Sequence, residues 1–292
     1  MKKPNLYIVG APKCGTTAMA VWLSQHPDIY VSAVKEPHYF GEEHRLTKTI
    51  EEYERLFSGV PEETRWVCEA SVWYLFSETA IKNIVQYNPE SKFIVMLRNP
   101  VDMALSMHEQ HRFNGNELVE DFQEALGLSD IREGGNGVGV RSGYHPVQHM
   151  AYYKSCALGW QVSNMLKIVP KENVFFAFFD DLKADPARVH EMVLDFLGVE
   201  FESPENYEKV NPAKERRYYF LDRFVLFLVS LKKRLGIRKR VRLLSRLRRW
   251  NVSYKERKPI DQETRGSIQC RFSNDIDLLS SILGRDLSDW KR

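Results

Sequence analysis

The sequence predicts an α/β fold in which a central parallel sheet is flanked by helices. Strand-length apolar runs alternate along the chain with segments of helical pattern, which is typical of a parallel sheet covered on both faces. The first apolar run leads directly into a glycine-containing turn and a helix. The chain shows no internal repeat and no domain-sized linker, so residues 1–292 are expected to form one domain.

The first half of the chain supplies most of the predicted strands. Residues 6–10, LYIVG, are an unbroken apolar run that predicts a buried strand, and a helix is expected over residues 16–25. A weaker strand is expected at RWVCEA, residues 65–70. The run KFIVMLRNP, residues 92–100, predicts a strand that ends at charge and proline, with a helix after it over about residues 101–112.

The second half continues the alternation of strands and helices. The sequence NVFFAFFDDL predicts a third strand over residues 173–182. A helix is expected to start near Asp185 and Pro186 and to stop at Gly198, because these residues are typical of the two ends of a helix. The glycine-rich residues 132–143 are expected to form a loop.

Composition narrows the class of protein. Hydrophobic residues make up 43% and charged residues 28% of the chain, as in soluble globular proteins. No signal peptide is recognised, and the apolar residues 224–231 are too few to span a bilayer. Four scattered cysteines without CxxC spacing favour free thiols in a reducing compartment over a disulfide framework or a metal cluster. We therefore expect a cytoplasmic protein, or one peripheral at the inner face of a membrane.

Charge is distributed very unevenly. Residues 214–258 hold 17 Lys or Arg and three acids, and the rest of the chain holds 25 basic and 36 acidic residues. This concentration predicts contact with an anionic partner. Within it, residues 231–250 combine leucine spacing with a dense basic face, which fits an anionic membrane surface, an anionic glycan or a solvated helix that caps the core. Nucleic acid is a weaker expectation because aromatic residues for base stacking are not interleaved.

The turn GAPKCGTT, residues 10–17, has the features of a phosphate-binding loop. A helix N-terminus at the carboxyl end of a strand offers free N–H groups and a partial positive charge. Glycine permits close approach of the backbone, threonine hydroxyls can donate to phosphate, and lysine adds a charge. The candidate phosphate-binding residues of this loop, which would hold a phosphate-containing cofactor, are Lys13, Cys14, Gly15, Thr16 and Thr17.

The loop departs from the nucleotide-hydrolase pattern GxxxxGK[ST]. Thr16 stands where that pattern has lysine, and Lys13 comes two residues before Gly15. Hydrolysis of ATP or GTP is therefore not favoured, and the fold is best described as P-loop-like. A purely structural turn is the alternative. Cys14 can be read as a nucleophile or as a small filler of a tight turn, and we favour the filler because no local partner is visible.

Two further segments carry candidate site residues. Arg98 ends a predicted strand and Ser106 follows two helical turns later, so the pair can converge on a second anionic group; a buried ion pair is the alternative for Arg98. In YVSAVKEPHYF, residues 30–40, Glu36 and His38 lie in an extended stretch after the first helix. Either can act as a general base, and a solvated glutamate is the alternative for Glu36.

With these motifs in order, the sequence resembles the sulfotransferases that use 3′-phosphoadenosine 5′-phosphosulfate (PAPS), most closely the heparan-sulfate type and its bacterial relatives. The PKxGTT loop of that family, which takes the 5′-phosphosulfate, is matched by residues 12–17. Its RxxxxxxxS motif for the 3′-phosphate is matched by Arg98 and Ser106, and its catalytic glutamate falls on Glu36 of KEPHYF.

The C-terminal part extends this resemblance. KERKP, residues 255–259, is similar to the family's KGRxxP segment, so Lys255 and Arg257 are expected to close over the nucleotide. LGRDLSDW, residues 283–290, is similar to the family's ending. Two departures stand out: Ala70 occupies the place of a second catalytic lysine of the family, and Glu256 replaces the glycine of KGR. Lys35, beside Glu36, is a candidate to replace the missing lysine.

The resemblance implies sulfuryl transfer from PAPS to a hydroxyl or amine, on an anionic or neutral glycan or a glycolipid, without a metal. Glu36 would be the general base, with His38 as its rival, and Lys13 would stabilise charge on the leaving phosphate oxygen. A P-loop nucleotide kinase is the alternative among enzymes, and the missing lysine argues against it. A non-catalytic module that binds polyanions or membranes is the alternative from another class.

Overall fold

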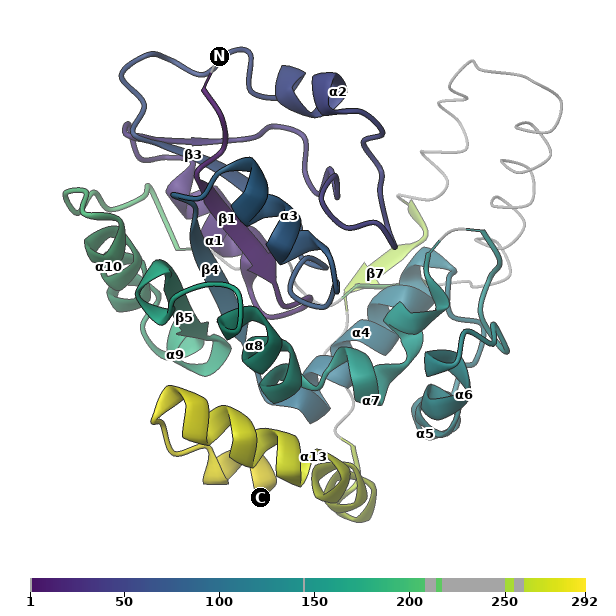
Figure 1. Cartoon of the computed structure of the whole chain (residues 1–292). Coiled ribbons are helices and arrows are strands. Elements are labelled where there is room, and N and C mark those ends of the chain that lie inside the picture. The colour runs from purple at the N-terminus through teal and green to yellow at the C-terminus, as the bar shows by residue number, and fades with distance from the viewer. Residues whose placement is uncertain (1, 144, 208–213, 217–249, 255–259) are drawn as a thin grey trace, which may run out of the picture. The chain divides into compact units, whose positions relative to one another are not determined.

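The structure is a computed structural model in which residues 2–143, 145–207, 214–216, 250–254 and 260–292 are described (Figure 1). They belong to two compact units. Of the described residues, the first unit comprises 2–104, 152–207 and 262–292, and the second comprises 105–143, 145–151, 214–216, 250–254 and 260–261. Within the described residues, no helix combines the length and the apolarity needed to cross a bilayer.

A five-stranded sheet forms the centre of the first unit, and all its neighbouring strands are parallel. Its strands are β1 (Leu6–Gly10), β2 (Ile29–Val31), β3 (Trp66–Ala70), β4 (Lys92–Leu97) and β5 (Val174–Phe178). The order β2-β3-β1-β4-β5 places β1 in the middle. This topology, with helices around it, confirms the predicted α/β class.

The central strand explains where a ligand would bind. All five residues of β1 are buried, as expected for a strand with neighbours on both sides. The chain first leaves β1 towards β2 and β3 and later enters β4 on the other side. In open α/β sheets, ligands bind beyond the carboxyl ends of the strands at such a reversal of strand order. The turn that follows Gly10 occupies this place.

Helices complete both units. Those of the first unit are α1 (Thr16–Leu23), α2 (Ile50–Arg55), α3 (Ala80–Tyr87), α7 (Tyr152–Ser155), α8 (Leu158–Leu166), α9 (Phe179–Ala184), α10 (Pro186–Leu197) and α13 (Gln262–Leu283), with short 3₁₀ helices η2 (Lys171–Asn173) and η3 (Ser288–Lys291). Helix α4 (Pro100–Asn114) begins in the first unit and ends in the second. The second unit also contains α5 (Phe122–Gly127), α6 (Ser129–Glu133), η1 (Val147–Met150) and the antiparallel strands β6 (Lys214–Arg216) and β7 (Val252–Tyr254).

Helix α10 shows why the local signals in the sequence succeeded. The side chain of Asp185 accepts a hydrogen bond from the N–H of Arg188, and Pro186 occupies the first helical position. At the other end, Gly198 adopts the left-handed conformation, with φ of 66°. The predicted helix between Asp185 and Gly198 is therefore confirmed.

The strand predicted over residues 173–182 is too long. Strand β5 ends at Phe178, and α9 begins at the next residue. Asp180 and Asp181 lie in the first turn of α9, where negative charge is favourable because it faces the positive end of the helix dipole. The aspartates that looked like the end of a strand are thus the start of a helix.

Helices α8 and α13 pack against each other, although they are distant in sequence (Figure 1). The carboxylate of Asp275 on α13 accepts hydrogen bonds from the N–H groups of Gly159 and Trp160, both at 2.8 Å. These groups belong to the first turn of α8, so a side chain from another helix caps it. A Cβ at Gly159 would lie 2.2 Å from the carbonyl oxygen of Asp275, and glycine permits this approach.

Candidate active site

The turn between β1 and α1 has the geometry of an anion-binding loop. Gly15 precedes α1 in the left-handed conformation, with φ of 96°, and no side chain caps the helix. The N–H groups of the first turn of α1 therefore keep their donors for a ligand. A Cβ at Gly15 would lie 2.7 Å from Leu182, so glycine is needed for both conformation and space.

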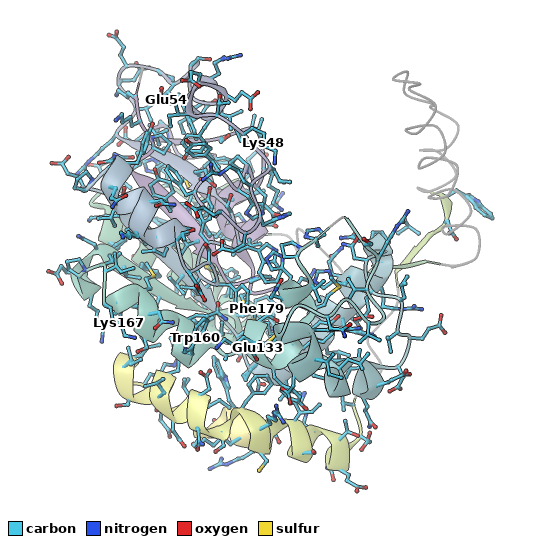
Figure 2. The ribbon with its side chains drawn as sticks, turned by 45° about the vertical axis from the view of Figure 1, so that its right-hand side comes forward. Lys48, Glu54, Glu133, Trp160, Lys167 and Phe179 are labelled. Carbon is cyan, nitrogen blue, oxygen red and sulfur yellow. The ribbon has the colours of Figure 1, made fainter. Side chains whose placement is uncertain are left out.

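The side chain of Arg98 contacts this loop and supports its backbone. It follows β4 directly and is only 7% exposed. Its Nη1 donates to the carbonyl oxygen of Lys13 at 3.0 Å, and its guanidinium lies 4.4 Å from the centre of the Phe179 ring, which is labelled in Figure 2. The structure thus brings Arg98 and the predicted phosphate loop together. Contact of Arg98 with a 3′-phosphate remains a prediction.

Cys14 lies on the inner side of the loop. Its side chain is fully buried, and the thiol is 3.4 Å from the carbonyl oxygen of Pro12 and 3.8 Å from the sulfur of Met103. Burial raises the pKa of the Cys14 thiol to about 12, so the thiolate is not populated near neutral pH. These contacts favour the filler over the nucleophile. Because its side chain is buried, Cys14 could contact a nucleotide bound at the loop only through its backbone.

The predicted catalytic segment, residues 30–40, contacts the loop through Lys35. Its Nζ donates to the Thr17 hydroxyl at 2.6 Å, although the two residues come from different elements. A lysine ammonium therefore lies beside the predicted phosphate-binding loop, and whether it replaces the lysine that the family has at the position of Ala70 remains a prediction. The N–H of Glu36 donates to the carbonyl oxygen of Ala70 at 3.1 Å, which ties the segment to the end of β3.

Glu36 and His38 form a pair. Oε2 of Glu36 lies 3.5 Å from Nε2 of His38. The Glu36 side chain is 34% exposed, whereas that of His38 is 3% exposed. The Glu36 carboxylate is therefore accessible to solvent, whereas His38 is buried beside it. Of the two predicted bases, Glu36 is the more accessible, and its role as base remains a prediction.

Backbone strain coincides with these residues. Among the described residues, those other than glycine that have a positive φ are Lys13 (64°), Glu36 (56°) and His38 (45°). A left-handed backbone at such residues costs about 1–3 kcal/mol each and persists only where surrounding contacts enforce it. All three were singled out from the sequence as catalytic candidates. The strain is consistent with side chains that are held in place for chemistry.

A buried glutamate that sequence reasoning missed lies beneath this segment. Glu69, on β3, is completely buried, and the Tyr53 hydroxyl donates to its Oε2 at 3.3 Å. Hydroxyls of Ser71 and Tyr74 also form hydrogen bonds with it. The pKa of Glu69 is raised to about 7, chiefly by burial and to a lesser extent by the charge of Glu36, while the hydrogen bonds from the hydroxyls act to lower it. Its one sequence signal was a lone charge inside the apolar strand WVCEA.

The hydroxyls around Glu69 also hold the catalytic segment. Ser71 Oγ accepts a hydrogen bond from the N–H of His38 at 3.1 Å, and the Tyr74 hydroxyl accepts one from the N–H of Phe40 at 3.2 Å. Two hydrogen bonds thus fix the backbone on either side of Tyr39. The network around Glu69 is therefore a support for the strained conformation of the segment that carries Glu36.

The remaining candidates are less fully placed. Ser106 lies in the second turn of α4 and is 1% exposed, and its role with Arg98 remains a prediction. Lys255, Arg257 and residues 231–249 of the basic segment lie outside the described residues. Among the side chains that the structure describes, no group of three or more His, Cys, Asp or Glu is placed to hold a metal ion.

Comparison with known proteins identifies similar sequences and structures. A family model for the sulfotransferase domain matches residues 3–216. The human bifunctional heparan sulfate N-deacetylase/N-sulfotransferase 1 is 28% identical over 207 residues, which cover 67% of this chain and 22% of that protein. The mouse heparan sulfate glucosamine 3-O-sulfotransferase 6 is 27% identical over 202 residues, which cover 67% of this chain and 52% of that protein.

A solved structure agrees over a greater length. The crystal structure of a sulfotransferase from Alicyclobacillus acidocaldarius has a TM-score of 0.74 and 27% identity, and the match covers 100% of both chains. The curated relatives are longer, and the match spans from about a fifth to about half of their length.

Proposed function

Because this chain belongs to the sulfotransferase domain family, we propose that it transfers a sulfuryl group from PAPS to a hydroxyl or amine of a carbohydrate or glycolipid. The observation that carries the proposal is the hydrogen bond between Lys35 and Thr17. It joins the loop suited to an anionic donor and the segment with an accessible carboxylate, so the two parts of a transfer site lie side by side.

The residues present suit the donor. The uncapped N-terminus of α1, together with Gly15 and the hydroxyls of Thr16 and Thr17, can hold the 5′-phosphosulfate, and Lys13 and Lys35 add positive charge. Arg98 and Ser106 would hold the 3′-phosphate, and Lys255 and Arg257 would close over the nucleotide. PAPS supplies an activated sulfuryl group whose S–O bond to the 5′-phosphate breaks during transfer.

Glu36 takes the proton from the acceptor. As the acceptor oxygen or nitrogen forms its bond to sulfur, its proton moves to the Glu36 carboxylate. His38, 3.5 Å away, holds that carboxylate in position. Negative charge develops on the leaving phosphate oxygen, and the cations of Lys13 and Lys35 stabilise it. The backbone strain at Lys13 is offset by the hydrogen bond from Arg98 to its carbonyl oxygen. The strain in the segment that carries Glu36 is offset by the hydrogen bonds to the network around Glu69.

The donor can be tested without knowledge of the acceptor. Adenosine 3′,5′-bisphosphate (PAP), ATP and GTP are compared by thermal shift, the last two with and without Mg²⁺. PAP at about 100 times its Kd should stabilise the protein by about 2.7 kcal/mol, and ATP and GTP should do so much less. Stabilisation by ATP with Mg²⁺ but not by PAP would contradict the proposal and favour a nucleotide kinase.

Glu36→Gln tests the assignment of the base. It should lower the rate of ³⁵S transfer from labelled PAPS to a glycan acceptor about 10²–10⁴-fold, because an amide cannot take the proton. The thermal shift with PAP should remain. Glu63→Gln, at an exposed position outside the site, is the matched control and should keep full activity. Full activity of Glu36→Gln would exclude Glu36 as the base.

A further inference from the structure

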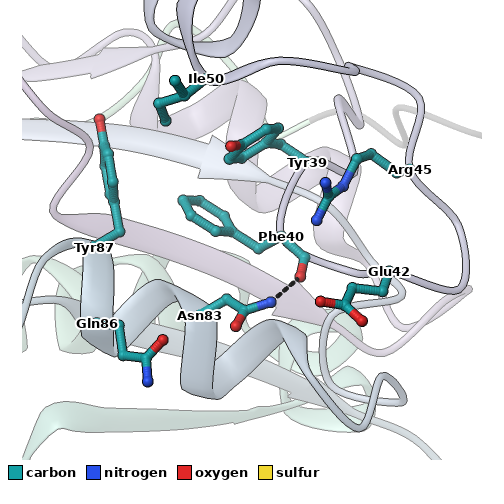
Figure 3. A pocket seen from close by; sticks show the side chains of 8 residues that line it. All are labelled: Tyr39, Phe40, Glu42, Arg45, Ile50, Asn83, Gln86 and Tyr87. Carbon is teal, nitrogen blue, oxygen red and sulfur yellow. Dashed lines mark hydrogen bonds between the residues drawn. The ribbon is translucent and has the colours of Figure 1, made fainter.

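The two parts of the proposed site are supported by different regions of the chain. The catalytic segment, residues 30–40, is supported by α3. Nδ2 of Asn83 donates to the carbonyl oxygen of Phe40 at 2.9 Å, as Figure 3 shows beside a pocket of about 410 Å³. The phosphate-binding loop and Arg98 are supported instead by α9 and by the C-terminal motif, residues 283–290, to which the proposed function gives no role.

Helix α9 contacts both anion-binding elements of the proposed donor site. The ring centre of Phe179, the first residue of this helix, lies 4.4 Å from the guanidinium of Arg98 and 5.1 Å from the ammonium of Lys183. On the side of the loop, a Cβ at Gly15 would lie 3.3 Å from this ring and 2.7 Å from Leu182. Because the guanidinium lies on the Phe179 ring, a shift of α9 changes the position of Arg98.

Arg285, in the C-terminal motif, holds α9 through a forked ion pair. Its Nη1 and Nη2 donate to the two carboxylate oxygens of Asp181, in the first turn of α9, at 2.5 and 2.8 Å. The same guanidinium lies 3.8 Å from the ring centre of Phe178, the last residue of β5. Two parallel hydrogen bonds fix the orientation of both groups. Both side chains are partly exposed, so the pair adds little to the free energy of unfolding.

Trp290, at the other end of the motif, contacts the residue next to Arg98. Its side chain is buried, and its ring lies 6.0 Å from that of Phe178, measured between ring centres. Its carbonyl oxygen accepts a hydrogen bond at 3.3 Å from Nδ2 of Asn99, which is buried as well. Oδ1 of Asn99 accepts a hydrogen bond from the N–H of Val101, in the first turn of α4, at 3.0 Å. The motif therefore holds the backbone directly after Arg98.

We propose that the C-terminal motif positions Arg98 for the 3′-phosphate of the nucleotide. Arg285 acts through α9, and Trp290 acts through Asn99. A guanidinium forms paired hydrogen bonds with phosphate only when its plane is correctly oriented, and supporting residues must hold such a group to within about 0.5 Å. The inference rests on the proposed function, which assigns the 3′-phosphate to Arg98. It makes Arg285 a positioning residue.

Calorimetric titration with two nucleotides tests this role. PAP and adenosine 5′-monophosphate (AMP) differ in the 3′-phosphate alone, so the ratio of their Kd values measures how well that phosphate is recognised. The wild type should bind PAP at least about tenfold tighter than AMP, because AMP lacks the phosphate that Arg98 would contact. Arg285→Gln should weaken the binding of PAP about five- to tenfold and that of AMP less than about twofold, because the variant affects the position of Arg98.

Three further variants examine the ion pair itself. Asp181→Asn breaks it from the side of α9 and should lower the ratio as much as Arg285→Gln does, and the double variant should lower it no further. Arg285→Lys keeps the charge without the fork, so it should retain part of the ratio. Arg292→Gln is the matched control, because Arg292 forms an exposed ion pair with its neighbour Asp289 and should keep the ratio of the wild type. Circular dichroism of each variant ensures that folded proteins are compared.

The Arg98→Gln background shows whether the effect depends on Arg98. There the ratio should already be low, and Arg285→Gln should not lower it further. A wild type that prefers PAP, together with an unchanged ratio in Arg285→Gln and Asp181→Asn, would overturn this inference alone. An equal loss of affinity for PAP and AMP would also overturn it, because the motif would then support the loop in general. A wild type that binds PAP no tighter than AMP would contradict the proposed function, and the inference with it.

Discussion

Glu69 in the first unit and Glu117 in the second are both completely buried, but their partners differ in kind. Glu117 receives two hydrogen bonds from Arg132, from Nη1 to Oε2 at 2.7 Å and from Nη2 to Oε1 at 3.0 Å. Glu69 is surrounded by hydroxyls, and among the described residues no Lys or Arg forms an ion pair with it. The arginine partner gives Glu117 a structural role as one half of an ion pair. Glu69 has no such partner in the described part of the chain, and its raised pKa allows it to titrate near neutral pH.

The Glu117–Arg132 pair organises the glycine-rich loop that the sequence predicted. Arg132 also donates to the carbonyl oxygens of Val138 and Met150, both at 3.2 Å. Gly139 has φ of 69°, and a Cβ there would lie 2.5 Å from Val119 and 3.0 Å from Arg132. Loop, helix and ion pair therefore depend on one another, since glycine allows the loop to close around the guanidinium.

The largest effect is predicted for a variant that breaks the ion pair between Glu117 and Arg132. Glu117→Gln leaves the Arg132 charge buried without a counter-charge and should lower the free energy of unfolding by about 3–5 kcal/mol. Urea denaturation measures this. Glu120→Gln is the matched control, because Glu120 also pairs with an arginine, Arg112, but its side chain is 78% exposed. That variant should lose less than about 1 kcal/mol. Equal losses would show that burial is not what distinguishes the two pairs.

The next prediction concerns the glutamate that lacks a cation. The pKa of Glu69 is about 7 in the folded protein and 4.5 for the reference group, so the folded state binds more protons than the unfolded state between these values. Stability from Glu69 is therefore present below about pH 4.5 and is lost as the pH rises through about 7. The loss should reach about 3 kcal/mol, at 1.36 kcal/mol for each pH unit.

Glu69→Gln isolates this contribution, because the amide resembles the protonated acid and does not titrate. The free energies of unfolding of wild type and variant are measured between pH 4.5 and pH 8, and the wild type should fall relative to the variant across that range. The pH profile of sulfuryl transfer should also change near pH 7 in the variant, since the charge of Glu69 acts on Glu36. A constant difference in unfolding free energy would contradict the raised pKa.

The same contrast explains what could be predicted from the sequence. Strand β1 and helix α10 follow from contiguous signals, an unbroken apolar run in one and caps at both ends in the other. Strand β2 has three residues, and α13 is mixed in polarity, so neither gives a clear period, and both were missed. Their positions are determined by packing against distant segments, which a local pattern does not contain.

The candidate site also contains residues that local sequence motifs predict and contacts that such motifs do not predict. Lys13 and Glu36 were found because each lies in a short motif of the family. The hydrogen bond from Lys35 to Thr17 joins segments 18 residues apart, and the network around Glu69 joins β3 to α2 and to the catalytic segment. Such contacts depend on which strands are neighbours, so composition and spacing do not predict them. The raised pKa of Glu69 follows from burial, which is a property of the fold.

The smallest effect is predicted for the removal of a single hydroxyl, that of Tyr53, next to Glu69. Tyr53→Phe removes the donor at 3.3 Å from Glu69 and should raise the pKa of that carboxyl further, because a hydrogen bond to the charged form is lost. A hydrogen bond to a charged group contributes about 1.5–3 kcal/mol and one to a neutral group about 0.5–1.5 kcal/mol. The variant should therefore lose about 1 kcal/mol more stability at pH 8 than at pH 5.

The double variant Tyr53→Phe with Glu69→Gln completes a mutant cycle. In the Glu69→Gln background, the effect of Tyr53→Phe on the free energy of unfolding should be the same at pH 5 and at pH 8, because no carboxylate forms at residue 69. If the pH dependence of Tyr53→Phe persisted there, it would arise from a titratable group other than Glu69. Hydroxyls would then not be what holds the charge of Glu69, and the contrast with the arginine-bound Glu117 would need a different cause.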